Sequence, residues 1–326
     1  MGDHRTSADP VAESHAPRIA VVGSLNADVT LWVPRRPSPD ETMHASRIAW
    51  FRGGKGANQA VAAARLGASV VMVGRVGDDE HGQWLRSGLE AEGIDCRHVA
   101  TVDVPTGLAV ITVDPKDVSI VVAAGANASL DADGVQAAAA EIAAADALLL
   151  QGEVSARAAR AAAEIARRHG VIVVLNPAPF NDVAPAVLPL ADVVIVNRAE
   201  AEQLHQSNSG GSAAEMRANA VLVETRGAEG CVVRASRPAE TALRAQDSRD
   251  IPEEISVPAP QVAVVDATGA GDAFAGAFAV GMASGTDPLD AADLAVRAGA
   301  WAVGVAGAQP SLPTMAQLQD VGDAGA

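Results

Sequence analysis

The stretch ALLLQGEVSARAARAAAEIARRHGVIVVL, residues 147–175, sets an Ala-rich segment between two short aliphatic runs. The runs ALLLQ (147–151) and VIVVL (171–175) are almost continuously apolar, which is typical of strands that are buried on both faces. The segment from Ser155 to His169 is long enough to return over the sheet as a helix. Strand, helix and strand in this order predict a right-handed crossover between two parallel strands.

The same alternation extends over most of the chain from Arg18 onward. Further aliphatic runs are IAVVG (19–23), SVVMVG (69–74), DVVIVN (192–197), AVLVET (220–225) and QVAVVD (261–266). Further helix candidates are residues 56–66, 80–92 and 130–145. We therefore predict an α/β fold with a doubly wound, mostly parallel sheet.

Two pairs of aliphatic runs have no helix between them. DVTLWV (28–33) pairs with SRIAWF (46–51), and LAVITV (108–113) pairs with VSIVVA (118–123) across a polar turn. We expect a small β-sheet inserted in the main domain, with its strands within about 28–51 and 108–123. A lid over a ligand cleft is a natural use of such an insertion.

The remaining segments define the expected boundaries. Residues 1–17 are polar and are expected to form a disordered tail, and residues 18–316 to form the main domain with its lid. Residues 317–326 read as a frayed C-terminal tail. The polar, Pro-containing segment 234–260 reads as a surface loop.

The charge balance restricts the kinds of partner. The formal net charge is −16, whereas a nucleic-acid binder needs a basic surface. The same charge repels a nucleotide at long range. A nucleotide site here would therefore depend on local backbone N–H donors and metal ions.

Cysteine usage and hydropathy bear on the compartment. Cys96 and Cys231 are the only cysteines, and no CxxC or HExxH motif indicates a disulfide framework or a zinc site. Residues 1–17 lack the apolar core of a signal peptide, and no apolar run reaches membrane-spanning length. We therefore expect a reduced, cytoplasmic protein without a membrane partner.

The strongest local signal is VVDATGAGDAFAGAFAVG, residues 264–281, in which a Gly-rich turn leads into an apolar helix. The backbone N–H groups of Gly269, Ala270 and Gly271 would stand at a helix N-terminus, which favours an anion such as a transferring phosphoryl group. Asp272 would follow in the first turn, placed to take a proton from an attacking hydroxyl. An ordinary turn whose Asp complements the helix dipole is the alternative.

A second signal is FRGGKGANQAVAAARLG, residues 51–67. Glycines let a backbone approach a small ligand closely, while Lys55 and Asn58 supply a charged donor and an amide. The combination suits a polyhydroxy ligand, and it is not a Walker loop because GxxxxGK[ST] is absent. The alternative is a simple strand-to-helix turn with Lys55 in solvent.

Several polar residues follow predicted strands directly, where ligands bind in parallel sheets. Asn26 and Asp28 lie in GSLNAD (23–28), whose single glycine does not make a dinucleotide fingerprint. Glu153, Asn197 and Glu200 follow two other strands, and such acidic groups could hold Mg²⁺ through waters. Asx turns and helix caps are the alternatives.

Together these motifs resemble the ribokinase-like, or PfkB-type, carbohydrate kinases. They occur in that family's order, over residues 18 to 312. The motifs are GSLNAD, GGKGANQAVAAARLG, LNPAP (175–179), NRAE (197–200), TRGAEG (225–230), DATGAGDAFAG and GAQPS (307–311).

The resemblance implies a role for each matching residue. Asp272 would be the catalytic base, and the backbone of Gly269, Ala270 and Gly271 the anion hole. Sugar contacts would come from Asn26, Ala27, Asp28, Gly54, Lys55, Gly56, Ala57, Asn58, Glu153 and Asp272.

Cofactor sites are implied in the same way. ATP contacts would come from Asn197, Glu200, Thr225, Arg226, Gly227, Ala228, Glu229, Gly230, Gly271 and Asp272. Glu200 lies in the family's Asn-x-x-Glu motif, associated with Mg²⁺ and phosphate. A monovalent cation, expected to be K⁺, would be held by Asp266, Thr268, Ala302, Val305, Gly307 and Ser311.

The implied activity is transfer of the ATP γ-phosphoryl group to the primary hydroxyl of D-ribose. Lys55 within GGKGAN favours the ribokinase branch over the fructokinase-like and adenosine-kinase-like ones. Another pentose, a nucleoside, a ketohexose, or a catalytically silent sugar-binding regulator are the alternatives. Family lids pair, so a homodimer is expected. Segment 201–224 is shorter than usual and 234–260 longer, which leaves the adenine contacts open.

Overall fold

The structure, a computed structural model, describes residues 16–116, 118–209, 216–217, 219–235 and 253–323. The expected tail over 1–17 lies almost entirely outside these ranges, as do residues 210–215 and 218 of segment 201–224 and residues 236–252 of segment 234–260. None of the described helices is long and apolar enough to cross a membrane.

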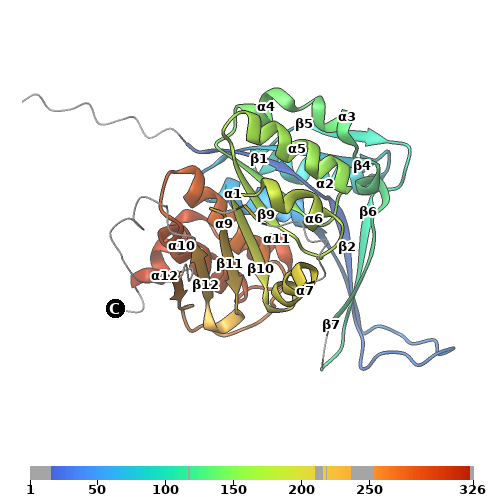
Figure 1. The fold of residues 1–326 in the computed structure, drawn as a ribbon. Coiled ribbons are helices and arrows are strands. Elements are labelled where there is room, and N and C mark those ends of the chain that lie inside the picture. The colour runs from blue at the N-terminus through green and yellow to red at the C-terminus, as the bar shows by residue number, and fades with distance from the viewer. Residues whose placement is uncertain (1–15, 117, 210–215, 218, 236–252, 324–326) are drawn as a thin grey trace, which may run out of the picture.

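Nine strands of the described chain form the central sheet (Figure 1). They are β1 (Arg18–Val22), β4 (Ser69–Gly77), β5 (Asp95–Val102), β8 (Ala147–Gln151), β9 (Ile172–Asn176), β10 (Val193–Asn197), β11 (Val221–Thr225), β12 (Cys231–Ala235) and β13 (Glu253–Val257). Their order is β13-β12-β11-β10-β9-β8-β1-β4-β5. Only β12 is reversed among these strands, since it pairs antiparallel with both β11 and β13, so the predicted mostly parallel sheet is confirmed.

Helices cover both faces of this sheet. One face carries α1 (Lys55–Arg65), α2 (Glu80–Ala91), α9 (Ala270–Ala283), α10 (Pro288–Ala302) and α12 (Met315–Asp323). The other carries α3 (Ala132–Gln136), α4 (Ala139–Ala143), α5 (Ala156–Arg168), α6 (Val183–Val187) and α7 (Arg198–Ser209). Short helical turns are η1 (Gly125–Ser129), η2 (Leu188–Leu190), η3 (Gly227–Glu229) and α11 (Ala308–Ser311).

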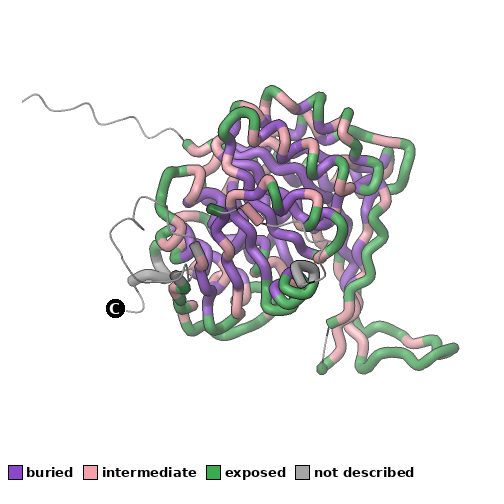
Figure 2. Tube along the Cα trace, in the orientation of Figure 1, coloured by how far each residue is buried: buried purple, intermediate pink, exposed green. Residues whose placement is uncertain are grey.

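Successive strand residues explain why both faces are apolar. Val193 and Ile195 of β10 pack into the core on one face, while Val194 and Val196 pack into the core on the other. Successive side chains of a strand point to opposite faces of the sheet. A strand can therefore contribute to both cores only if its successive residues are all apolar. The continuous aliphatic runs of the sequence therefore correspond to strands buried on both sides, as Figure 2 shows.

A separate four-stranded sheet leaves the main domain, as predicted for the lid (Figure 1). Its strands are β2 (Asn26–Trp32), β3 (Arg47–Gly53), β6 (Gly107–Val113) and β7 (Val118–Ala123), in the order β3-β2-β6-β7. The two predicted strand pairs join through β2 and β6, which run parallel. Much of the lid stays exposed (Figure 2), and Val121 of β7 is 71% exposed.

Several expectations about local structure were wrong. The run 261–266 forms no strand: Val264 and Val265 are exposed, and the N–H of Val265 donates to the carbonyl of Val303. It crosses the surface above α10 instead of entering the sheet. Within the expected loop 234–260, residues Glu253–Val257 form strand β13. The segment 130–145 is two short helices, α3 and α4, rather than one.

The C-terminal boundary also differs from the expectation. Helix α12 runs from Met315 to Asp323, so residues 317–323 are helical rather than a frayed tail. Leu318 is fully buried in the core beneath α10. Met315, at the start of the helix, also packs against this core, so apolar side chains one turn apart attach the short helix.

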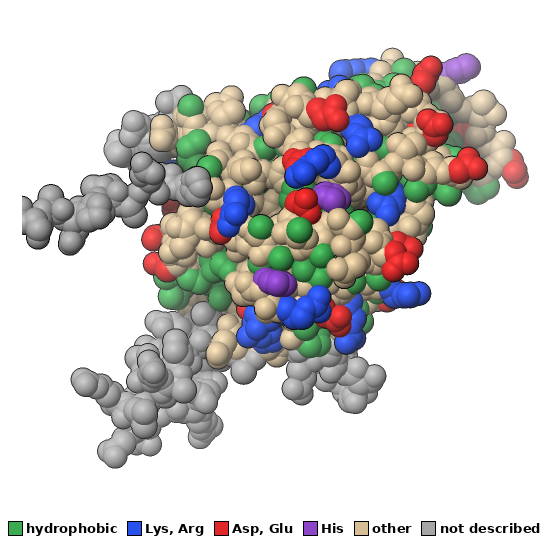
Figure 3. All heavy atoms as spheres, turned by 90° about the horizontal axis from the view of Figure 1, so that it is seen from above, with side chains coloured by type: hydrophobic (Ala, Val, Ile, Leu, Met, Phe, Trp, Pro, Cys, Tyr) green, Lys and Arg blue, Asp and Glu red, His purple; other side chains and the backbone are tan. Residues whose placement is uncertain are grey.

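Surface charge is mixed rather than segregated. On the face shown in Figure 3, acidic and basic side chains are interspersed. The net charge of −16 is therefore not gathered there into one acidic patch.

Helices α1 and α9 approach unusually closely, because small residues face each other at their crossing. A Cβ atom placed on Gly276 would lie 2.6 Å from the Cβ of Ala62 and 2.9 Å from the carbonyl oxygen of Gln59. Only glycine leaves room for this contact. The crossing brings the first turns of the two helices, and so Asn58 and Asp272, together.

We predict that Gly276→Ala lowers the free energy of unfolding by about 1–3 kcal/mol, the usual cost of overpacking a core. The added methyl group would push α9 away from α1. Urea denaturation measures the effect. Gly299→Ala on α10 is the matched control, because its Cβ would lie 3.4 Å from the Ala270 carbonyl, an ordinary contact. Equal stability of the Gly276→Ala variant and the natural chain would contradict the close-contact argument.

Candidate active site

A polar cleft of about 880 Å³ lies between the lid and the main sheet. On its lid side it is lined by apolar side chains, among them Ile111 and Ile120. The sequence-predicted residues that line it are Asn26, Asp28, Gly54, Lys55, Asn58, Glu153, Glu200, Asp266, Thr268, Gly269 and Asp272. Residues far apart in the chain thus meet where the parallel strands end, as expected for this kind of sheet.

Three predicted sugar contacts lie behind the cleft instead of on its surface. Ala27, Gly56 and Ala57 are buried and do not line the cleft. The N–H of Ala57 donates to the carbonyl of Ser24 at 2.9 Å. These residues hold the turn into α1 against the first strand, so their place in the motif is explained by backbone packing.

The first turn of α1 requires glycine. Gly54 has a φ of 90°, and a Cβ there would lie 2.7 Å from both the N of Asn26 and the O of Ser24. The next residue, Lys55, donates its N–H to Glu153 Oε2 at 3.0 Å. The same carboxylate oxygen accepts the hydroxyl of Ser24. Glu153 thereby joins the ends of β1 and β8 to the start of α1.

Carboxylates surround the Lys55 side chain. The carboxylate of Asp272 is the largest cause that raises the pKa of Lys55 above its ordinary value, although burial opposes it. The other carboxylates acting in the same direction are Glu153, Glu200 and Asp28. Lys55 therefore stays protonated and offsets the negative charge of the cleft.

Asp28 is an unusual member of this group. Burial, reinforced by the nearby charges of Glu153 and Asp272, raises its pKa from 3.8 to about 7. Its Oδ1 atom is buried and has no hydrogen-bond partner among the described residues. A buried carboxyl oxygen without a partner is costly. It is therefore available for a hydroxyl of a bound ligand.

Asp272 stands at the start of α9 and is 5% exposed. Its Oδ2 accepts the side-chain amide of Asn58 at 2.8 Å, and its Oδ1 accepts that of Gln59 at 3.1 Å. The turn before it needs glycine at residue 269, where φ is 83°. Helix α9 begins without a side-chain cap, unlike α2 and α5, which Asp79 and Ser155 cap. Its open N-terminus suits an anion.

Asn197 and Glu200 form a reciprocal cap at the start of α7. The N–H of Asn197 donates to Glu200 Oε2, and the N–H of Glu200 donates to Asn197 Oδ1, both at 2.9 Å. Burial raises the pKa of Glu200. Glu200 lines the polar cleft and keeps one carboxylate oxygen outside the cap, whereas Asn197 is exposed and lines neither cavity. The free oxygen fits the hard, oxygen-rich ligation that Mg²⁺ prefers.

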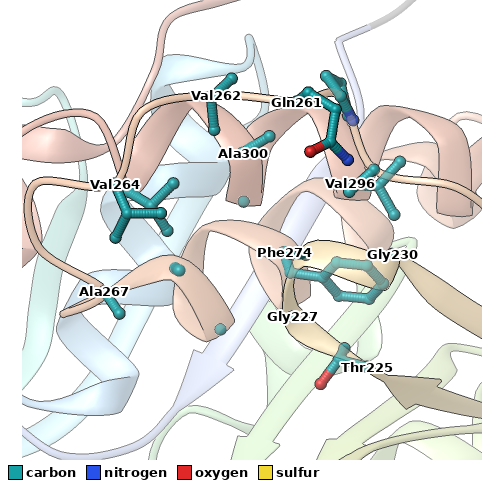
Figure 4. A pocket seen from close by; sticks show the side chains of 17 residues that line it. Thr225, Gly227, Gly230, Gln261, Val262, Val264, Ala267, Phe274, Val296 and Ala300 are labelled. Atoms are coloured by element: carbon teal, nitrogen blue, oxygen red, sulfur yellow. The ribbon is translucent and has the colours of Figure 1, made fainter.

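An apolar pocket of about 300 Å³ lies on the other side of the Gly-rich turn (Figure 4). Phe274 and Val296 line it, and the exposed segment with Val262 and Val264 passes over it. The predicted nucleotide residues that line it are Thr225, Gly227, Ala228, Gly230 and Gly271, and Ala270 of the predicted anion hole lines it too.

Two residues of the predicted nucleotide loop do not line this pocket. Arg226 bonds to Glu224 at 2.9 Å, and Glu229 is exposed and pairs with Arg198 at 3.3 Å. Both side chains hold the loop 225–230 to its neighbours. The turn needs glycine at Gly230, where φ is 91°.

The two cavities meet at one turn. Ala267 lines both of them, Gly269 and Asp272 face the polar cleft, and Ala270 and Gly271 face the apolar pocket. A ligand in one cavity and a ligand in the other would therefore approach each other at the N-terminus of α9. This geometry suits transfer of a group between two bound molecules.

The predicted cation residues gather partly around Asp266. Its Oδ1 accepts the hydroxyl of Thr268 at 2.6 Å and its Oδ2 accepts the N–H of Gly307 at 2.8 Å. Burial opposes ionisation of Asp266, but these hydrogen bonds outweigh it and lower its pKa. Ser311 is buried and donates its hydroxyl to the Ala308 carbonyl.

Another predicted cation ligand, the carbonyl of Ala302, already accepts a hydrogen bond within its own segment. The carbonyl of Ala302 accepts the N–H of Val305 at 3.3 Å. The ionised Asp266 beside these carbonyls fits a cation, since carbonyl and carboxylate oxygens are its usual ligands.

Sequence reasoning missed several lining residues. Asn127 lines the cleft and donates its amide to Asn26 Oδ1 at 2.8 Å, and Asn181 donates to the carbonyl of Gly152 at 2.7 Å. Neither follows a predicted strand directly. Gln59 lies inside the motif FRGGKGANQAVAAARLG, but the sequence alone assigned no role to it, and it is buried behind the cleft.

Comparison with known proteins agrees with this arrangement. The model of the pfkB family carbohydrate kinases matches residues 16–315. A ribokinase of Haemophilus influenzae is 36% identical over 298 residues, covering 91% of this chain and 95% of that protein. A deoxyribokinase of Salmonella typhi is 33% identical, covering 93% and 97%. An Arabidopsis thaliana ribokinase, solved with ribose and ATP, superposes with a TM-score of 0.78 at 28% identity, covering 94% and 99%.

The raised pKa of Asp28 predicts a pH-dependent stability. The folded-state value of about 7 exceeds the ordinary 3.8, so this group's contribution is complete below about pH 4 and is lost as the pH rises through 7. Asp28→Asn cannot ionise. We expect the variant to be more stable than the natural chain at pH 8, by about 1–4 kcal/mol, with a smaller difference at pH 5.

Urea denaturation at both pH values checks this expectation. The same exchange at exposed Asp103 serves as the control and should change stability little at either pH. A difference for Asp28→Asn that is equal at pH 5 and pH 8 would show that burial of its charge is not the cause.

Proposed function

The chain belongs to the pfkB family of carbohydrate kinases, phosphotransferases with an alcohol group as acceptor, and on this premise we propose that it phosphorylates D-ribose. The γ-phosphoryl group of ATP passes to the primary hydroxyl, giving D-ribose 5-phosphate and ADP. The observation that carries the proposal is the meeting of the polar cleft and the apolar pocket at the 267–272 turn.

The sugar occupies the polar cleft in this proposal. Asp28, whose Oδ1 lacks a partner among the described residues, accepts a sugar hydroxyl. Lys55 and Asn58 add a charged and an amide donor beside it. The lid residues Ile111 and Ile120 close the opposite side and exclude water from the bound ligand.

The adenine of ATP fits the apolar pocket, because a flat ring system suits walls such as Phe274 and Val296. The phosphates then point toward the open N-terminus of α9, where backbone N–H groups of residues 269–271 stabilise the transferring group. Local donors of this kind are needed, since a net charge of −16 does not attract a nucleotide from a distance.

Asp272 is the proposed base. Both its oxygens already accept amide hydrogen bonds from α1, so the carboxylate is held in one orientation. It takes the proton of the primary hydroxyl as the oxygen attacks the γ-phosphorus, and the ADP oxygen leaves with the electron pair.

Two ions are part of the proposal. Mg²⁺, held through Glu200, neutralises charge on the phosphates when bound. A monovalent cation such as K⁺, near Asp266 and the carbonyls of the 302–307 loop, orders the anion hole beside it. Equal rates in K⁺, Na⁺ and Tris buffers would remove the monovalent ion from the account.

We also propose that two copies pair through the lid. Ile48, Trp50 and Val121 leave large apolar surface exposed on it, at 59%, 45% and 71%. Exposed patches of this kind mark interfaces. A monomeric mass in solution at micromolar concentration would contradict the pairing.

The acceptor is tested by ADP release across a panel of D-ribose, 2-deoxy-D-ribose, other pentoses, ketohexoses and nucleosides. The highest kcat/KM is expected with D-ribose. A clear preference for 2-deoxy-D-ribose, or for a nucleoside, would move the chain to another branch of the family. Sugar binding without ADP release from any compound would favour a silent regulator.

We predict that Asp272→Asn lowers kcat with ribose by about 10²–10⁴, the usual cost of losing a general base. The amide keeps the shape of the carboxylate but cannot accept the proton. The KM for ribose should change little. Lys55→Ala is the comparison, because loss of a ligand-positioning group should act mainly on KM. If Asp272→Asn kept more than about a tenth of the rate, Asp272 would not be the base.

A further inference from the structure

A chain of buried amides lies behind Asp272, on the side away from the polar cleft. Gln59 and Gln151 are fully buried, and Asn176 is 8% exposed. None of the three lines either cavity. They come from α1, β8 and β9, so the chain joins the proposed base to the centre of the sheet.

The hydrogen bonds of Gln59 use its whole amide group. Its Nε2 donates to Asp272 Oδ1 and to Asn176 Oδ1, both at 3.1 Å. Its Oε1 accepts the amide of Gln151 at 2.8 Å. An amide nitrogen has two protons to donate, so both are in use and one of them is on the carboxylate of Asp272.

The direction of this chain is set by the backbone. Asn176 donates its Nδ2 to the carbonyl of Ile195 at 2.9 Å, which leaves its Oδ1 facing Gln59. A reversed Gln59 amide would turn its oxygen toward Asn176 Oδ1 and the Asp272 carboxylate, where it would meet only acceptors. Gln59 can therefore present only its N–H group to Asp272.

Room for the second glutamine depends on a glycine in the first motif. A Cβ at Gly23 would lie 2.1 Å from Gln151 Oε1. That oxygen is buried and has no hydrogen-bond partner among the described residues. Gly23 therefore leaves the space in which Gln151 lies beneath Gln59. Networks of this kind specify one arrangement of the groups they hold.

We propose that Gln59 is a positioning residue that fixes the Asp272 carboxylate for proton transfer, and that Gln151 acts one step behind it by orienting Gln59. The inference rests on the proposed function of Asp272 as the base. Asn58 holds the other carboxylate oxygen but also lines the cleft, so its loss would affect sugar binding as well. Gln59 touches the reaction only through Asp272.

The test compares Gln59→Met with Gln151→Met. Methionine keeps nearly the same length and volume without the amide. Gln59→Met should lower kcat with ribose about 10- to 100-fold, because the variant loses one hydrogen bond to a charged group and this is the rate equivalent of such a bond. The KM for ribose should stay within about threefold of the natural value. Gln151→Met removes an equally buried amide and should lower kcat less. Equal losses of kcat, or a loss that falls on KM, would overturn the proposal.

A double variant separates positioning from general damage. In the Asp272→Asn background no base remains to be positioned, so adding Gln59→Met should lower the residual kcat no further. A second loss of similar size would indicate a purely structural role. If Asp272→Asn itself stays active, the proposed base is wrong. If it is inactive but Gln59→Met is normal, only the positioning role is wrong.

Gln59→Glu provides a variant of the same shape. It places a second carboxylate against Asp272 Oδ1 where the amide donated, and should lower kcat more than Gln59→Met does. It carries the test if the methionine variant fails to fold, as judged by thermal unfolding. A Gln59→Glu enzyme with the natural kcat would overturn the proposal by itself.

Discussion

The close crossing of α1 and α9 is the contact on which the site depends. Gly276 has no side chain, and any Cβ there would meet Ala62 at 2.6 Å. Because the helices approach this far, Asn58 and Gln59 of one reach Asp272 of the other. A wider crossing would move these amide donors away from the carboxylate. The small residues at the crossing therefore determine both the packing of the two helices and the position of the proposed base.

Electrostatics within the cleft are organised around one cation. Four carboxylates that are far apart in the sequence act on Lys55, and Asp272 has the largest influence on it. Burial and the neighbouring carboxylates keep the proton on Asp28 up to about pH 7. An acidic protein can bind an anionic cosubstrate under these conditions only by directed groups, namely the open N-terminus of α9 and the apolar pocket behind it. The groups that favour an anion are thus confined to the site, whereas the net charge of the whole chain disfavours one.

Continuous aliphatic runs predicted the central strands well. A strand that is buried on both faces is apolar at every position, so it stands out in the sequence as an unbroken apolar run. The same rule was wrong for residues 261–266, where an equally apolar run lies exposed over α10. Apolarity alone does not say whether a neighbouring strand is available to pair with. Asp272, Lys55 and Asn58 could be singled out because each lies in a Gly-rich turn. Gln59 could not, since its partners Gln151 and Asn176 come from distant strands that only the fold brings together.

A crystal structure of the full chain with D-ribose, Mg²⁺ and a non-hydrolysable ATP analogue tests the central claim most directly. The account predicts the primary hydroxyl within hydrogen-bond distance, about 3 Å, of the Asp272 carboxylate. It also predicts the γ-phosphate at the backbone N–H groups of residues 269–271 and the adenine against Phe274. A sugar whose primary hydroxyl points away from Asp272, or a phosphate chain that leaves the 267–272 turn, would contradict it.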